Sequence, residues 1–259
     1  MVKLMKIYIF AFLVLFSYGC ASTLGYREKP NDVKKMSEIS VLIDVSVAKD
    51  ILGLKDMVDV PENLDMGNDS AGKIAGKLKE AGYKTGKTEV ASIGATFNGF
   101  TEYKVIYDPS ERSVSSIKHK TSIPPFFIET AYDDNEKVRE RLLELHKGLL
   151  KRDAESIKGS KSLGFISDGL LVVQEGGFVD SWGKKVLKGI YNFFIVIFSG
   201  GKADGDMKSE DGMWIRMYLI ELKSGEVVWA GAEETSSSPT MPKMGKLAKK
   251  VMKRFPTKQ

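Results

Sequence analysis

The residue with the clearest chemistry is Cys20, the single cysteine among 259 residues. It directly follows Gly19, shortly after an unbroken apolar run at residues 7–16 that two lysines precede. The run is about half of the roughly 20 residues that a helix needs to span a bilayer. This pattern predicts a cleaved signal peptide over residues 1–19 rather than a transmembrane anchor. A thiol exposed beside a small glycine is a suitable nucleophile for acyl transfer, so we expect Cys20 to carry a lipid.

Gly19, Cys20 and Ala21 resemble the bacterial lipobox, in which Leu, a small residue and then Gly or Ala precede the acylated cysteine. Ser17 and Tyr18 depart from the first two positions of that motif. Ordinary signal-peptide cleavage beside an incidental cysteine is the alternative. The resemblance implies anchoring through palmitate-like acyl chains. Because Ala21 rather than Asp follows the cysteine, it also implies a place on the outer membrane, facing the periplasm.

Several apparent catalytic motifs lack the context that their chemistry needs. Ser70-Ala71-Gly72-Lys73 matches the S-x-x-K of penicillin-binding serine enzymes, and Lys84-Thr85-Gly86 matches their K-T-G. In those enzymes the two motifs are far apart, whereas here a short segment separates them. Residues 67–73 resemble a phosphate loop without the magnesium-binding hydroxyl, and residues 81–88 lack the required strand–loop–helix order. The sequence therefore favours a non-catalytic protein that binds no nucleotide.

Composition excludes further classes of protein. With one cysteine and two histidines, neither a disulfide scaffold nor a zinc site is expected. The acidic run at residues 204–211 does not fit a calcium loop, so we expect no metal and no cofactor. The net charge of +5 arises from the chain ends, because residues 235–259 contain seven basic and no acidic residues. Basicity is therefore no evidence for nucleic-acid binding.

Hydrophobic periodicity predicts the elements of one domain. Strands and helices alternate, and an antiparallel pair comes late in the chain, which favours a single-domain α/β sandwich with a mixed sheet over residues 39–256. A polar segment ending at residue 38 is expected to tether this domain to the lipid, so the lipidated tether covers residues 20–38. The expected strands cover residues 39–47, 87–97, 102–107, 123–129, 169–175, 213–222 and 227–235. The expected helices run from the caps at 68–70 to Gly82, from the caps at 133–135 onward, and from Met244 to Phe255.

Two groups of residues are candidates for contact with a partner or a membrane. Phe193, Phe194 and Ile197 lie in an almost wholly apolar segment, residues 190–198, which suits a core helix, a lipid-dipping segment or an oligomer contact. Lysines occupy the polar face of the terminal amphipathic helix, at Lys246, Lys249, Lys250 and Lys253. That face is either solvated or in contact with lipid headgroups, cell-wall polymer or an acidic protein.

The order of elements resembles a group of bacterial envelope lipoproteins. The strand at 170–174, the hairpin with LKSGEVVWAG at its turn, and a terminal helix closing on Phe255-Pro256 look like the α/β domain of the curli-secretion lipoprotein CsgG and of penicillin-binding-protein activators. The resemblance implies a non-catalytic accessory or assembly role in the envelope, with an envelope protein or a second copy as partner. Residues 92–123 depart from it. A cell-wall hydrolase with an unrecognised site and a subunit of an oligomeric secretion channel remain the alternatives.

Overall fold

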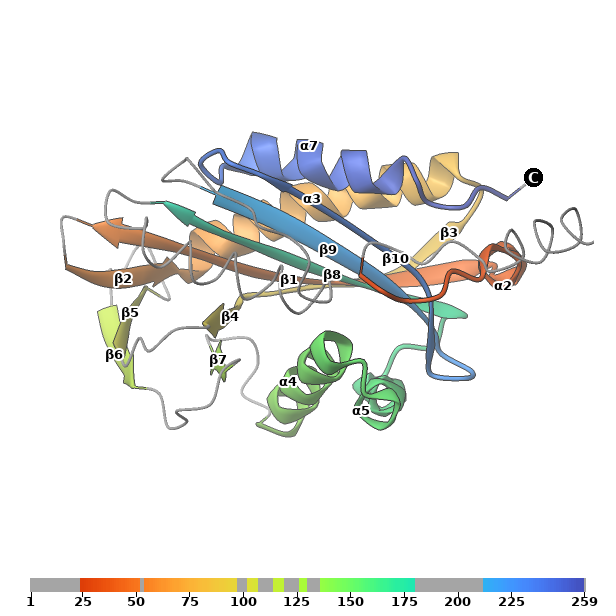
Figure 1. Ribbon diagram of the computed structural model, residues 1–259, viewed down its shortest axis with the longest axis horizontal. Coiled ribbons are helices and arrows are strands. Elements are labelled where there is room, and N and C mark those ends of the chain that lie inside the picture. Colours follow the sequence, from red (N-terminus) through yellow and green to blue (C-terminus); the bar gives the residue numbers. More distant parts are fainter. Residues whose placement is uncertain are drawn as a thin grey trace, which may run out of the picture.

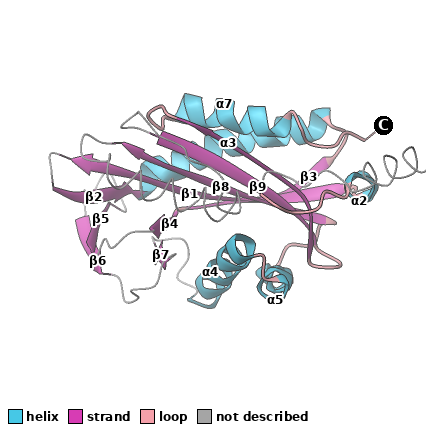
Figure 2. Cartoon of the chain, in the orientation of Figure 1, coloured by secondary structure: helices cyan, strands magenta, loops and turns pink. Residues whose placement is uncertain are grey.

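The computed structural model describes residues 24–51, 54–96, 102–106, 114–118, 126–129, 136–179 and 212–258. Helices cover both faces of one mixed sheet (Figures 1 and 2). Helices α3 and α7 lie on one face, and α4 and α5 lie on the other. The helices are α2 (Pro30–Lys35), α3 (Val60–Glu80), α4 (Glu136–Lys151), α5 (Ala154–Lys158) and α7 (Met241–Met252), with a 3-10 turn η1 (Gly159–Leu163).

The main sheet has eight strands in the order β10-β9-β8-β1-β2-β5-β6, with β3 also paired to β1. Strand β1 pairs in parallel with β3 and β8, whereas β9 and β10 form the predicted antiparallel hairpin. The strands are β1 (Glu38–Ile51), β2 (Leu54–Asp59), β3 (Lys84–Ala91), β5 (Glu102–Ile106), β6 (Val114–Lys118), β8 (Gly169–Val179), β9 (Gly212–Glu221) and β10 (Glu226–Thr235). A separate pair consists of β4 (Ile93–Thr96) and β7 (Phe126–Glu129). The predicted α/β class, with its mixed sheet, late hairpin and terminal helix, is confirmed.

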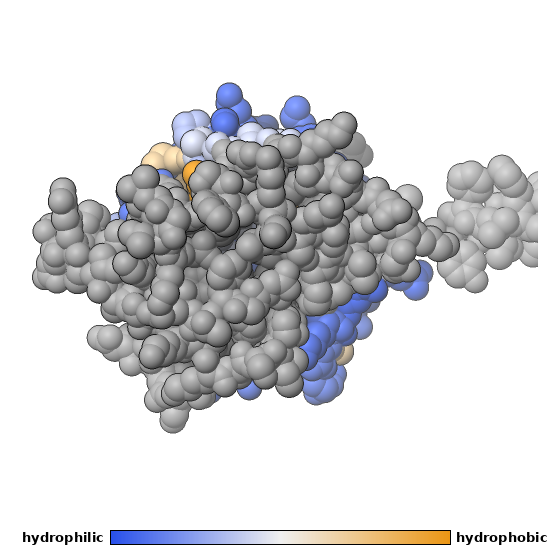
Figure 3. Space-filling model, turned by 60° about the vertical axis from the view of Figure 1, so that its left-hand side comes forward, coloured by the Kyte–Doolittle hydropathy of each residue, from blue (hydrophilic) through white to orange (hydrophobic). Residues whose placement is uncertain are grey.

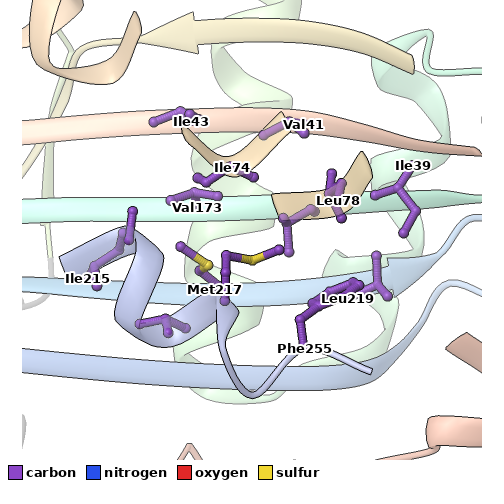
Figure 4. Close-up of a cluster of buried hydrophobic side chains, with 14 of the residues drawn as sticks. Ile39, Val41, Ile43, Ile74, Leu78, Val173, Ile215, Met217, Leu219 and Phe255 are labelled. Atoms are coloured by element: carbon purple, nitrogen blue, oxygen red, sulfur yellow. The ribbon is translucent and has the colours of Figure 1, made fainter. Parts of the chain in front are cut away.

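Strand β1 is apolar on both faces because it separates two cores. Val41 and Ile43 point toward α3 and α7, and Leu42 points toward α4. Figure 4 shows the first core, where side chains from the sheet meet Ile74 and Leu78 of α3. On the α4 side, the second core includes Leu142, Leu145, Leu149, Leu170, Val172, Tyr218 and Ile220.

Helix α7 confirms the periodicity argument most directly. Its stripe of apolar residues is buried throughout: Met244, Leu247, Ala248, Val251 and Met252, followed by Phe255. The rings of Tyr83 and Trp229 meet Phe255 edge-on, with centroids 5.6 and 4.8 Å away. The terminal helix is therefore fixed to the sheet by its apolar face, and its lysines lie outside.

Helix α3 begins earlier than its sequence indicates. The helix was expected to begin at the caps of residues 68–70, yet the chain is helical from Val60, where the Asp59 carboxylate accepts a hydrogen bond from the Glu62 backbone N–H. A carboxylate at this position satisfies one of the free N–H groups of the first turn. The glycine and asparagine residues that suggest a loop are tolerated because Met66 and Gly67 pack into the core.

The segment expected to be a tether also has more regular structure and packing than its sequence indicates. From residue 24 onward it packs on the domain, with Leu24, Val33 and Met36 buried. The Lys29 backbone N–H donates to the Val228 carbonyl at 2.8 Å. These apolar residues are too widely spaced to show a period, and tertiary contacts fix them. The described part of the expected tether therefore belongs to the domain.

Candidate functional site

A row of polar side chains crosses the sheet inside the core on the α4 side. Asp44 of β1 pairs in register with Gln174 of β8, which pairs with Arg216 of β9. Residues in register on adjacent strands share a face, so the three side chains project toward α4. All three are buried, with 5 to 6% of each residue exposed.

His146 of α4 contacts two members of this row from the helix that covers this face of the sheet. Its Nδ1 lies 2.7 Å from Gln174 Nε2, and its Nε2 lies 3.2 Å from Asp44 Oδ2. Burial lowers the pKa of His146 from 6.5 to about 4, so the imidazole is neutral near pH 7. Because the amide donates to Nδ1, the ring proton sits on Nε2 and faces the carboxylate. Both ring nitrogens therefore lie beside a buried polar side chain, and the ring has no exposed surface.

His146 is the histidine of the helix at residues 136–151, and it lies inside the fold with its ring fully buried. Its carboxylate partner comes from β1 and not from its own helix. No local spacing could have identified that partner.

Arg216 has aromatic neighbours before and after it on β9. The guanidinium lies over the Trp214 ring, 4.6 Å from the centroid. Gly176 makes room for that ring, since a Cβ there would collide with it. Burial lowers the pKa of Arg216 to about 10 and raises that of Tyr218 to about 12, so at pH 7 the arginine stays charged and the tyrosine neutral. The Tyr26 ring meets Tyr218 edge-on at 5.7 Å, and its hydroxyl donates to the Leu149 carbonyl.

A second buried polar group lies on the opposite face of the sheet. Glu175 of β8 is fully buried beneath α3, next to Ser70 and the ion pair of Asp69 with Lys73. Burial raises the pKa of Glu175 from 4.5 to about 8, and the Ser70 hydroxyl opposes that change only in part. The side chain is therefore mostly a neutral acid at pH 7.

The apparent serine-enzyme motif is not brought together in the part of the chain described. Ser70 lies in the middle of α3 with its hydroxyl buried, and Lys73 binds Asp69. Lys84 begins β3, a different element from the one that carries Ser70. Within the described residues, no group of three or more histidine, cysteine, aspartate or glutamate side chains is placed to hold a metal ion.

The lysines proposed as contacts lie on the outer face of α7. Lys246, Lys249 and Lys253 are exposed. Lys250 is also exposed, and its Nζ lies 2.6 Å from Glu233, a carboxylate that Arg254 contacts at 3.0 Å. Hydrophilic residues line the upper edge of the molecule, where α3 and α7 lie (Figure 3). The other predicted site residues, Cys20, Phe193, Phe194 and Ile197, lie outside the described residues, as does the signal peptide.

Sequence reasoning missed the buried polar residues, although a signal was present. Asp44 interrupts the apolar run of β1, and Gln174 and Glu175 end the run of β8. A charged residue inside a strand that is apolar on both faces needs a buried partner. The pattern could have indicated such groups without naming their partners.

Among known proteins, this chain is similar in fold to solved structures that share little of its sequence. No protein-family model matches the chain, and no curated protein matches it. Among solved structures, the PelC dodecamer from Paraburkholderia phytofirmans is 13% identical, with a TM-score of 0.27, covering 84% of this chain and 88% of that one. Lipoprotein GNA1162 from Neisseria meningitidis is 9% identical, with a TM-score of 0.28, covering 84% of this chain and 96% of that one. At these identities and TM-scores, the likeness carries no argument about function.

Proposed function

We propose that this protein is a lipid-anchored, non-catalytic module of the bacterial envelope that binds an acidic partner protein through the lysine face of α7. Cys20 carries the lipid, and the module faces the periplasm from the outer membrane. Anchoring restricts the domain to the membrane surface and so raises its effective concentration for a partner in the same compartment.

The observation that carries this proposal is the division of α7 into two faces. The apolar face is buried in the sheet core, so the helix cannot turn to hide its lysines. Lys246, Lys249 and Lys253 have no ion-pair partner among the described residues, whereas Lys250 is paired with Glu233. Unpaired cations on one rigid face favour an anionic ligand, because attraction orients the partner before contact.

The buried titratable groups support a structural rather than a catalytic use of the interior. His146 and Glu175 have strongly displaced pKa values, which often mark active sites. Here burial causes each displacement, and both side chains are shielded from solvent. Among the described residues, no helix combines the length and apolar character needed to span a bilayer, and the proposed attachment is through Cys20.

The test is chemical crosslinking in native membranes followed by affinity capture and mass spectrometry. We expect a specific acidic protein to be captured by the wild type. The double variant Lys246→Glu/Lys249→Glu should reduce that capture about tenfold or more, because attraction becomes repulsion. Lys151→Glu, at the end of α4 on the opposite face of the sheet, is the matched control and should retain capture.

Three results would contradict the proposal. Equal capture by the charge-reversed variant would exclude the lysine face as the contact. Turnover of cell-wall material, or labelling by a β-lactam probe that Ser70→Ala abolishes, would indicate a hydrolase. A ring-sized particle in mild detergent, without a partner protein, would indicate a channel subunit.

A further inference from the structure

One end of the sheet gathers the turns at which β1, β3 and β8 begin. The Lys84 N–H donates to Ser37 O, the Leu222 N–H donates to Asp168 O, and the Lys258 N–H donates to Ala81 O, at 3.0, 3.0 and 2.8 Å. We call this region the strand-start end, and it lies on the right in Figure 1. It consists of residues 34–37, 81–84, 158–168, 222–225 and 255–258.

Ile166 projects from the strand-start end into solvent. It is 98% exposed, the most exposed large hydrophobic residue in the described part of the chain. Gly164, with φ +78°, turns the chain after η1, and the half-buried Phe165 packs on the α4-side core. On the other side, the Ser167 hydroxyl donates to Ser40 Oγ at 2.8 Å. The isoleucine is therefore held outward between two anchored neighbours.

Basic residues are numerous in the segments that form this end of the sheet. The five segments of the strand-start end contain seven basic residues and one acidic residue, Asp168. Asp168 is occupied, because its Oδ2 accepts hydrogen bonds from the Ser37 N–H, the Ser37 hydroxyl and the Glu38 N–H. Acids at the adjoining element ends offset part of the surplus, because Asp32 pairs with Lys35 and Glu155 pairs with Lys158. The seven basic residues are Lys34, Lys35, Lys84, Lys158, Lys161, Lys223 and Lys258.

We infer that the strand-start end rests on an anionic lipid bilayer, with Ile166 inserted among the acyl chains and the lysines against the headgroups. A single apolar side chain in a basic rim suits a lipid surface, which accepts side chains one at a time. A stable protein interface needs a larger contiguous apolar core. The lysine face of α7 extends along the domain away from this end and stays open to a partner.

The inference rests on the proposed lipidation, which keeps the domain near the bilayer. Three residues separate Cys20 from Leu24, which is buried in the α4-side core. Even fully extended, that connection spans at most about 14 Å. An anchored domain therefore cannot move far from the membrane surface.

The experiment uses the acylated full-length protein in vesicles of phosphatidylethanolamine and phosphatidylglycerol that contain brominated lipid. Because the proposed acylation consumes the thiol of Cys20, Ile166→Cys supplies a unique site for a fluorophore. Asn68→Cys, exposed on α3 away from the strand-start end, is the matched control. We expect bromine to quench the label at 166 at least about two-fold more than the label at 68, and Lys161→Glu/Lys223→Glu to reduce that difference.

The outcomes separate the two proposals. Vesicle-bound protein with equal quenching at both positions would overturn the bilayer contact and leave the anchor intact. The same conclusion would follow if the label at position 166 were shielded from solvent only when a captured protein partner is present. A second labelled thiol, at Cys20, on protein that does not bind vesicles would show that the anchor itself is absent.

Discussion

Two buried residues, His146 and Glu175, are neutral near pH 7 for the same physical reason. Burial penalises the charged form of each, which lowers the pKa of the imidazole to about 4 and raises that of the carboxyl to about 8. The histidine has polar partners in Gln174 and Asp44. The glutamic acid lies beneath a helix, with Ser70 as its polar neighbour.

These two displacements affect stability in opposite directions. Between pH 4.5 and 6.5, the unfolded chain binds a proton at His146 that the folded chain refuses, whereas the folded chain keeps a proton at Glu175 that the unfolded chain loses. Their contributions to the slope of stability with pH therefore cancel in that range. From pH 6.5 to 8 only Glu175 acts, and stability falls as pH rises.

Glu175→Gln should therefore stabilise the protein in alkaline solution. Glutamine keeps the shape and cannot ionise, which removes the slope that Glu175 contributes between pH 4.5 and 8, roughly 1 kcal/mol per pH unit. Denaturant unfolding should show a gain at about pH 8 that nearly vanishes at about pH 5. Glu144→Gln, on the exposed side of α4, is the control and should change neither value. An equal effect of Glu175→Gln at both pH values would show that its ionisation does not limit stability.

At the scale of elements, sequence periodicity predicted the helices and strands that have one buried face and one exposed face. The stripe of α7 and the β9–β10 hairpin were predicted because one face is buried and turn residues bound them. The first turns of α3 were missed, since Gly67, Asn68 and Asp69 have low helix propensity. Packing overrides that propensity, because Gly67 lies against Val45 of β1 and Val90 of β3, where there is no room for a Cβ.

Two glycines of α3 give opposite predictions for the same substitution. A Cβ at Gly67 would collide with the stiff side chain of Val90 and lie 3.0 Å from Val45 Cγ2, whereas a Cβ at Gly76 has open space. Gly67→Ala should destabilise the domain by roughly 1–3 kcal/mol through overpacking. Gly76→Ala should stabilise it by roughly 0.5–1 kcal/mol, because alanine favours the helix. Thermal unfolding of both variants checks this, and a gain in stability for Gly67→Ala would refute the close approach of α3 to the sheet.

At the scale of the whole molecule, the sequence predicted the layers but not the contacts between them. The class of fold follows from the alternation of elements, which is local information. The polar row of Asp44, Gln174 and Arg216 depends on the register of three strands from distant parts of the chain, and His146 reaches it only because α4 covers that face. The burial of Leu24 could not be predicted from the sequence either, because it too depends on contacts between distant parts of the chain.

Under the proposed lipidation, the attachment of the whole domain depends on one thiol, Cys20, which only three residues separate from the buried Leu24. Contact by Ile166 and a few lysines is weak without acyl chains, because one inserted side chain and screened charges bind reversibly. Cys20→Ala should therefore either block processing, so that the precursor mass persists, or release a processed domain that moderate salt washes from membranes. Membrane fractionation with intact-mass measurement distinguishes these results, and Ser22→Ala, which leaves the thiol in place, should remain processed and membrane-bound. A processed Cys20→Ala protein that stays on the membrane through the salt wash would show that attachment depends on the folded domain and not on the lipid.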